Sequence, residues 1–81
     1  MTNQNPIDEV RDCIAKCLVL DIEKLSAASK IGEFPEWDSL GHIRIFFAIQ
    51  DRFSITIPLE LAGDARSVGD WAAAVRKSSG Y

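Results

Sequence analysis

The sequence predicts an all-α fold, a small four-helix bundle with a long connection after the first helix and a short third helix. Apolar residues recur at the helical period in several stretches, and helix-start signals precede these stretches. One short stretch alternates like a strand, but there is no second strand for it to pair with. From a length of 81 residues we expect a single domain, residues 1–81, with an ordered core at about residues 5–77.

The first helix is predicted from Asn5, as the N-cap, and Pro6, at the first helical position, to about Leu20. Its apolar face consists of Ile7, Val10, Ile14, Cys17 and Leu18. The connection that follows, Asp21–Asp38, loses this periodicity, although it contains apolar residues that we expect to pin it to the core: Ile22, Leu25, Ile31 and Phe34. A connection of this length is uncommon in a compact domain unless it carries function.

The second helix is predicted to start near Ser39 and to end near Phe53. Projected at about 100° per residue, its apolar residues cover an arc of roughly 220°. They are Leu40, Ile43, Ile45, Phe46, Phe47, Ile49 and Phe53. We therefore expect this helix to be packed on more than one side. The remaining narrow polar strip, which solvent or a partner would contact, consists of Gly41, Arg44, Asp51 and Arg52.

Residues Phe53–Pro58 alternate like a strand and are interpreted as an extended connection with Ile55 and Ile57 turned inward. Pro58 is expected to open a short third helix, which continues through Leu59 and Leu61 and is stopped by Gly63. We interpret Ser67 and Asp70 as a capping box for the last helix, whose apolar residues include Val68, Trp71 and Val75. The tail Lys77–Tyr81 is expected to be frayed.

The net charge is −3; residues 1–38 carry eight acids and four bases, whereas residues 39–81 carry four acids and five bases. Neither half has the basic surplus of a nucleic-acid-binding protein. A core of this size favours a binding module over an enzyme with a deep cleft. The sequence shows no secretory signal and no apolar run long enough to span a membrane, so we expect a soluble, cytoplasmic monomer. Met1 and the short polar tail favour a free-standing polypeptide.

The two cysteines, Cys13 and Cys17, fall on the same face of the first helix at a spacing that is poor for a mutual disulfide. No second group of Cys or His residues offers further metal ligands. We interpret both as small buried apolar residues in a reducing compartment.

Ser39 is the main candidate for chemistry. At a helix start the backbone N–H groups lack helical partners and the helix dipole favours negative charge, so a phosphodiester on this hydroxyl would be stabilised. The alternative interpretation is that Ser39 only caps the helix, since Ser is a preferred N-cap residue. If Asp38 provides the cap instead, Ser39 takes the first helical position with its hydroxyl free.

Two motifs carry a resemblance to a known family. Asp38-Ser39-Leu40 looks like its modification motif, and Phe53–Pro58 followed by Ser67-Val68-Gly69-Asp70 looks like its third-helix and fourth-helix boundaries. On these motifs the chain resembles the acyl carrier proteins of fatty acid and polyketide biosynthesis, over nearly its whole length. Departures from the common family pattern, which bear on the choice of partner enzymes, are Trp37, Gly41, His42, Arg44 and Ser54.

The resemblance implies that a phosphopantetheinyl transferase attaches a 4'-phosphopantetheine arm from coenzyme A to Ser39, with Asp38 and Leu40 as flanking recognition residues. It also implies that a ligase or transferase loads an acyl or aminoacyl group as a thioester on this arm, for use by a downstream synthase. The carrier itself is not an enzyme. The alternative is a helical protein-interaction module that kept the fold without the arm.

Other residues near Ser39 are less specific. A hydrolytic trio with Asp38 and His42 is disfavoured, because the chain lacks a Gly-x-Ser-x-Gly elbow and a Gly-rich oxyanion segment. We expect His42 to be partly buried or to contact the connection, whereas Trp37 could pack beneath the connection or touch a partner. Trp71 is expected to pack in the core. A negative patch of Glu33, Glu36 and Asp38 is either a solvated loop or a feature that steers a basic partner.

Overall fold

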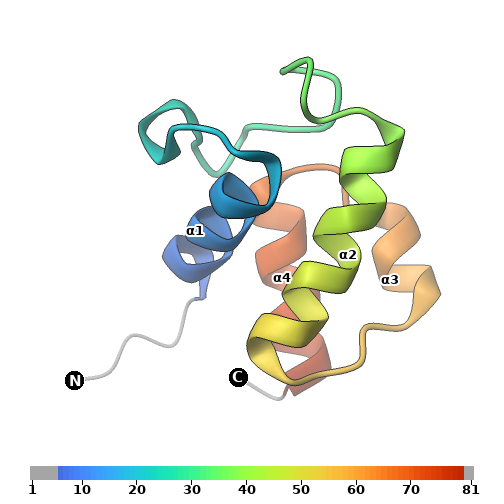
Figure 1. The fold of residues 1–81 in the computed structure, drawn as a ribbon. Coiled ribbons are helices and arrows are strands. Elements are labelled where there is room, and N and C mark those ends of the chain that lie inside the picture. The colour runs from blue at the N-terminus through green and yellow to red at the C-terminus, as the bar shows by residue number, and fades with distance from the viewer. Residues whose placement is uncertain (1–5, 80–81) are drawn as a thin grey trace.

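The computed structural model describes residues 6–79 and confirms the predicted all-α class, with four α-helices and no strand in that range (Figure 1). The elements are α1 (Ile7–Leu18), a 3-10 helix η1 (Ile22–Lys24), α2 (Ser39–Phe53), α3 (Leu59–Asp64) and α4 (Val68–Ser79). Helix α1 packs against both α2 and α4, and the short α3 packs against α4. The long connection between α1 and α2 runs across one end of this bundle.

The core consists of side chains from the three longer helices and from the connections. Trp71 of α4 is fully buried, as the sequence predicts, and Trp37 of the long connection is buried to the same degree. The other largest fully buried side chains are Val10, Ile14, Ile45, Ile49, Ile57, Val68 and Val75. Because Trp37 belongs to the connection, this segment is part of the core rather than a loop on the surface.

Helix α1 ends at Leu18, so the predicted end near Leu20 was wrong; the predicted N-cap, Asn5, lies outside the described residues. Val19 adopts a left-handed conformation with φ of 57°, and its N–H donates to the Ala15 carbonyl. The Leu20 N–H donates to the same oxygen at 2.8 Å. This closure ends the helix, although it usually relies on glycine and here occurs at a β-branched residue.

We expect Val19→Gly to stabilise the fold by about 1 kcal/mol, because glycine adopts the left-handed conformation without strain. Little packing is lost, since Val19 is 87% exposed. Urea unfolding of the two proteins would measure this. Val19→Ala keeps a Cβ and serves as the control, and a destabilising effect of the glycine would contradict the assignment of strain.

Helix α2 has the predicted bounds and, as predicted, packs on more than one side, but part of its wide apolar arc is exposed. Ile45 and Ile49 are fully buried, whereas Leu40, Ile43 and Phe47 are more than half exposed. The helix contacts α1 on one side and the Trp71 ring of α4 on another. The structure therefore leaves an apolar stripe of Leu40, Ile43 and Phe47 on the surface.

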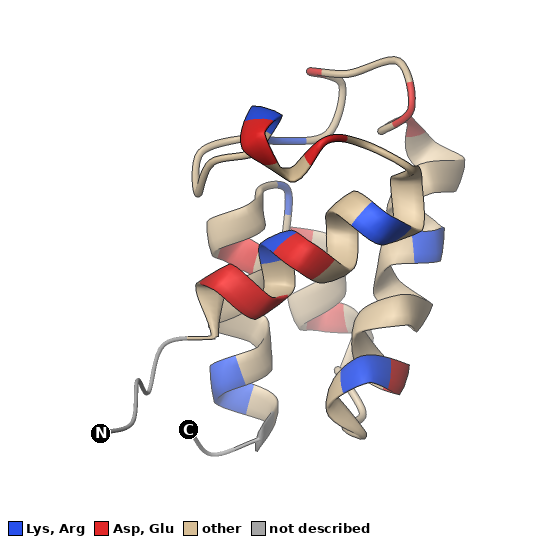
Figure 2. Ribbon diagram, turned by 60° about the vertical axis from the view of Figure 1, so that its left-hand side comes forward, with Lys and Arg blue, Asp and Glu red and all other residues tan. Residues whose placement is uncertain are grey.

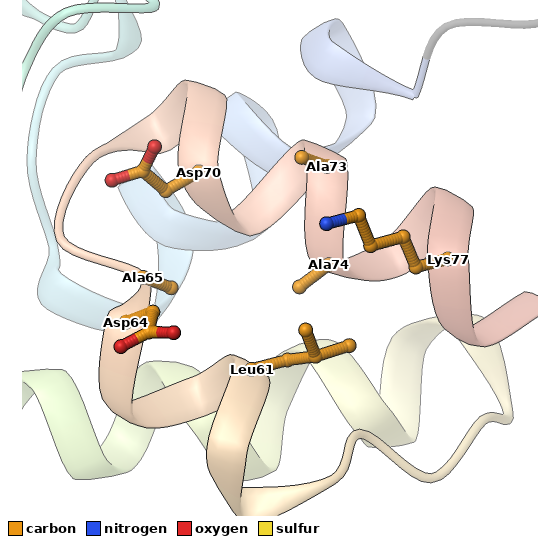
Figure 3. Close-up of a pocket in the computed structure, with 7 residues that line it drawn as sticks. All are labelled: Leu61, Asp64, Ala65, Asp70, Ala73, Ala74 and Lys77. Carbon is orange, nitrogen blue, oxygen red and sulfur yellow. The ribbon is translucent and has the colours of Figure 1, made fainter.

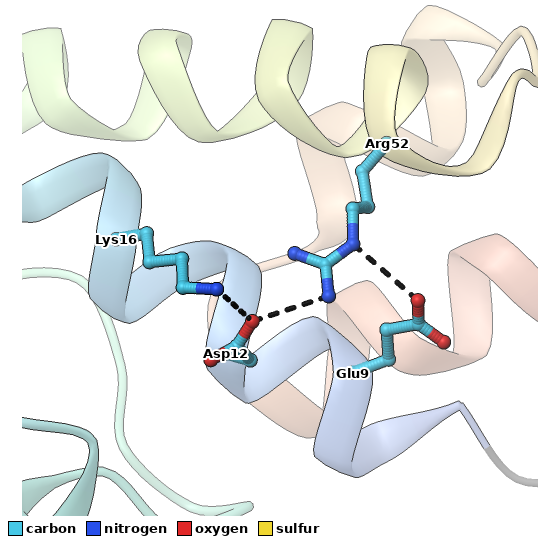
Figure 4. Close-up of polar contacts among 4 residues, drawn as sticks. All are labelled: Glu9, Asp12, Lys16 and Arg52. Atoms are coloured by element: carbon cyan, nitrogen blue, oxygen red, sulfur yellow. Dashed lines mark hydrogen bonds and ion pairs between the residues drawn. The ribbon is translucent and has the colours of Figure 1, made fainter.

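The predicted polar strip of α2 also needs correction. Gly41 is buried beneath the connection, so it is not part of an exposed strip. Arg52 makes ion pairs with Glu9 at 3.3 Å and Asp12 at 3.1 Å on α1 (Figure 4). Hydrogen bonds from Lys16 and Arg52 hold the pKa of the Asp12 carboxyl below its ordinary value. Arg52 therefore joins α1 to α2, and Arg44 and Asp51 remain as exposed charges.

The long connection is attached to the start of α4 by backbone hydrogen bonds. The Ile31 N–H donates to the Arg66 carbonyl and the Val68 N–H donates to the Ser29 carbonyl, both at 2.9 Å. A single antiparallel bridge between Lys30 and Ser67 lies between them. As predicted, the apolar residues of the connection contact the core: Leu25 is buried, and Ile22, Ile31 and Phe34 are partly buried.

The extended connection after α2 turns Ile57 into the core and leaves Ile55 partly buried, as predicted. Helix α3 continues through Gly63 to Asp64, so the predicted stop at Gly63 was wrong. Its C-cap, Ala65, bonds back to the Ala62 and Leu61 carbonyls, which ends the helix without a left-handed glycine.

The prediction of a capping box before α4 was half right. The Ser67 hydroxyl accepts from the Asp70 N–H at 3.1 Å, but the Asp70 carboxylate accepts from the Arg66 N–H rather than from that of Ser67. Helix α4 extends to Ser79, so the tail is helical beyond the predicted boundary at Lys77, and residues 80–81 lie outside the described part. The helix start is thus fixed by side chains on both sides of the turn.

Both cysteines are free. Cys13 is buried, as predicted, whereas Cys17 is only partly buried, and burial is the main cause that raises the pKa of each thiol.

Candidate functional site

Ser39 is the first residue of α2, and its side chain is exposed. The preceding residue, Asp38, is the N-cap, and its carboxylate accepts from the Gly41 N–H at 2.8 Å. Of the two sequence interpretations, the cap therefore belongs to Asp38. Within residues 6–79 no group hydrogen-bonds the Ser39 hydroxyl, which leaves it free for modification.

Gly41 fixes the position of the segment before Ser39. A Cβ built at this residue would collide with the Glu36 carbonyl oxygen and would lie 3.1 Å from Cδ2 of Leu18. Only a residue without a side chain allows the connection to rest against the first turn of α2 at this point. The chain therefore enters α2 along a fixed path, with Asp38 in place to cap and Ser39 outward.

We expect Asp38→Ala to lower the free energy of unfolding by about 1 kcal/mol, the usual cost of a lost N-cap. Ser39→Ala should change it by less than about 0.5 kcal/mol, because its exposed hydroxyl caps nothing. Urea unfolding of the unmodified proteins measures both. The reverse order, with the larger loss at Ser39, would show that Ser39 is the cap in solution.

An exposed apolar stripe begins next to Ser39. Leu40, Ile43 and Phe47 are 57%, 53% and 62% exposed, and Leu59 at the start of α3 is 77% exposed. Neighbouring exposed apolar side chains of this size are unusual on a small soluble domain and mark contact surfaces. Periodicity assigns these α2 residues to a wide apolar arc, but it does not tell which part of that arc has a neighbour.

His42 joins the connection to the end of α3. Its Nδ1 accepts from the Trp37 indole Nε1–H at 2.9 Å, and its Nε2 lies 2.8 Å from the Ala65 carbonyl oxygen. Burial lowers the pKa of the His42 imidazole, against the opposing effect of the Ala65 hydrogen bond. The expectation of partial burial is confirmed, and Trp37 proves to pack beneath the connection. Both ring nitrogens are occupied, so His42 is not a base for Ser39.

An apolar hollow of about 230 Å³ lies between α2, α3 and α4. Its lining consists of His42, Ile43, Phe46, Leu59, Ala62, Gly63 and Trp71. On α2, the residues at positions 42, 43 and 46 follow Ser39 at the spacing of one helix face. The hollow therefore lies along the face of α2 that has Ser39 at its N-terminal end.

Two other hollows are more polar. One of about 330 Å³ lies between the end of α1 and the start of α2 and includes Val19, Asp38 and Arg44 in its lining. The other, of about 130 Å³, lies between α3 and α4, where Asp64, Asp70 and Lys77 surround small side chains (Figure 3). Neither has an apolar wall like that of the hollow beside His42.

The acidic residues Glu33, Glu36 and Asp38 are all exposed. Figure 2 shows acidic segments on α1 and along the connection that leads to α2. The predicted negative patch before Ser39 is therefore a solvated surface, and its steering role stays a prediction.

No protein-family model matches the chain. No helix in the described part of the chain is long and apolar enough to cross a membrane. Among residues 6–79 no group of three or more His, Cys, Asp or Glu side chains could hold a metal ion.

Proposed function

We propose that the protein is a carrier that holds an acyl group on a 4'-phosphopantetheine arm attached to Ser39. The observation that carries this proposal is the exposed Ser39 hydroxyl, which stands at the first position of α2 while Asp38 provides the cap. The order of elements, with a long connection before α2 and a short α3, supports the same proposal, because it is the order that the family resemblance implies.

The residues around Ser39 fit such an arm. The phosphodiester would lie at the N-terminus of α2, where the free N–H groups and the helix dipole favour negative charge. When attached, the arm supplies a thiol on a flexible tether for the acyl group. The chain itself contributes a rigid attachment point, since Gly41 and Asp38 fix the start of α2.

The apolar hollow supports one class of cargo over the other. Its walls are aromatic and aliphatic, and burial lowers the pKa of its single titratable group, His42, whose Nδ1 accepts from Trp37 only when the ring is neutral. An aminoacyl group would bring a charged ammonium against these walls, which is unfavourable without a partner. The hollow therefore favours an uncharged acyl cargo over an aminoacyl cargo.

The exposed stripe of Leu40, Ile43 and Phe47 supports a role in docking the phosphopantetheinyl transferase, which must approach Ser39. The stripe begins at the residue after Ser39 and continues along α2 for two turns. An enzyme that covers Ser39 would bury these side chains, and burial of large apolar residues is favourable.

A second candidate function is a protein-interaction module without the arm. The same stripe favours it, because an apolar docking surface needs no modified serine. The two candidates differ in one respect: only the carrier is a substrate for the transferase.

Incubation with coenzyme A and a broad-specificity phosphopantetheinyl transferase should convert the protein to a single product that carries one phosphopantetheine group. Intact mass spectrometry measures the conversion. Ser39→Ala should remain unmodified, and Ser26→Ala, which removes another exposed serine from the connection, should be converted fully. If the unchanged protein remains unmodified under conditions that convert a known carrier, the interaction module is the better proposal.

Phe47→Ser should lower kcat/KM for this modification by about tenfold, because it removes a large apolar contact from the proposed docking surface. Its exposure of 62% means that the fold should be retained. Ala73→Ser, an exposed position on α4, is the matched control and should be modified at the original rate. Equal rates of modification for all three proteins would show that the stripe is not part of the transferase contact.

A further inference from the structure

One imidazole ring joins three separate segments of the molecule. Trp37 belongs to the long connection, His42 to the first turn of α2, and Ala65 to the C-cap of α3. The His42 ring contacts the first through Nδ1 and the last through Nε2, at 2.9 Å and 2.8 Å. It also lies against the Trp71 ring of α4, with centroids 5.1 Å apart. His42 is therefore one of the points where the connection is tied to the helices.

These contacts define the protonation state of the ring. An indole N–H can only donate, so Nδ1 of His42 must accept and carries no proton. A neutral imidazole has one N–H, which is then at Nε2 and donates to the Ala65 carbonyl. Only the neutral form with the proton at Nε2 makes both bonds.

Protonation removes one of these bonds and keeps the other. In the imidazolium both nitrogens are donors, so an Nδ1–H would face the Nε1–H of Trp37. The Trp37 side chain is fully buried, and its donor would lose its acceptor. A buried donor without a partner is unfavourable, so protonation favours movement of Trp37. The bond to Ala65 is unaffected.

The charged groups on the neighbouring elements do not compensate a positive ring. Arg66, next to Ala65, is itself a cation and disfavours protonation. The carboxylate of Asp38 in the connection accepts from Gly41, and that of Asp70 in α4 accepts from Arg66.

The remaining neighbours are also directed elsewhere. Asp64 of α3 lines the separate hollow that it shares with Lys77, and Arg44 of α2 lines the hollow beside α1. The Ala65 carbonyl would attract an imidazolium, and so would the Trp71 ring, which lies with its centroid 5.1 Å from that of His42. Both hold the ring in place without restoring the bond to Trp37.

We propose that His42 is a proton-controlled latch for the segment before Ser39: the neutral ring holds Trp37 in place, and protonation releases it while the helices stay folded. Trp37 in turn holds the connection, because its carbonyl accepts from the Gly32 N–H at 2.8 Å and its N–H donates to the Phe34 carbonyl at 3.0 Å. Release of Trp37 would loosen residues 32–38. An effect on modification of Ser39 rests on the proposed function, whereas the latch itself does not.

The test is an NMR titration of the unmodified ¹⁵N-labelled protein from about pH 7.5 to about pH 5, the range in which histidine titrates. The chain has one histidine and two tryptophans, so the side-chain signals are few. We expect the His42 midpoint below the ordinary pKa of 6.5, because burial and the bond from Trp37 favour the neutral ring. With protonation, hydrogen exchange of the Trp37 indole, relative to free indole, should accelerate by about tenfold or more. Backbone amides of Val10 and Ile14 in α1 should stay protected.

Two variants separate the latch from a general effect of acid. His42→Asn keeps an acceptor oxygen near the position of Nδ1 and does not titrate, so Trp37 should stay protected across the range. Trp37→Phe removes the donor, so the His42 pKa should rise towards its ordinary value. Trp37 protection that is unchanged while His42 titrates would overturn the proposal, as would simultaneous loss of protection at Val10 and Ile14. An unchanged His42 midpoint in Trp37→Phe would overturn it too. None of these outcomes depends on whether Ser39 can be modified.

Discussion

The close contact between the long connection and the first turn of α2 is the constraint on which the site depends. Gly41 allows the Glu36 carbonyl to rest against the helix, and the end of α1 meets the same point through Leu18. This contact sets the path by which the chain enters α2 and so brings Asp38 into capping position. Ser39 becomes the first helical residue as a consequence. Close backbone packing at Gly41, which has no side chain, thus places the Ser39 hydroxyl at a rigid and exposed point.

Helix α2 combines two environments along its length. Ile45 and Ile49 fix it in the core, and Arg52 ties its last turn to the acidic side chains of α1. Leu40 and Phe47 remain on the surface beside Ser39. Exposing such side chains forgoes burial that a small domain needs. The arrangement is reasonable if the stripe is covered during contact with another protein, which both candidate functions require.

The sequence predicted those parts of the fold that depend on local signals. The bounds of α2 and the burial of Trp71 follow from helix-start signals and periodicity, and the structure agrees, whereas the sequence left the cap open between Asp38 and Ser39. The end of α1 could not be predicted, because Val19 takes a left-handed conformation that its residue type disfavours. From the sequence alone Gly41 belongs to the polar strip of α2. Its burial becomes apparent only when the position of the connection is known.

The bond between Trp37 and His42 also depends on tertiary structure. The two residues are near in sequence, but the other ring nitrogen of His42 bonds to Ala65, which follows much later in the chain. The exposed stripe and the apolar hollow also depend on tertiary structure, because they depend on which helices pack against α2 and which do not. The sequence therefore indicated Ser39 as the candidate residue, whereas its surroundings required the three-dimensional arrangement.

His42 belongs both to the apolar hollow and to the contacts that hold the connection before Ser39. Its ring is part of the wall of the apolar hollow, and its nitrogens hold the connection and the end of α3. Under the carrier proposal, an apolar group in the hollow would cover this ring and remove it further from water. Further burial disfavours the charged imidazole, so it would strengthen the bond to Trp37. By linkage, protonation of the ring would in turn weaken the retention of that group. The protonation equilibrium of His42 would then control both binding in the hollow and order in the segment before Ser39.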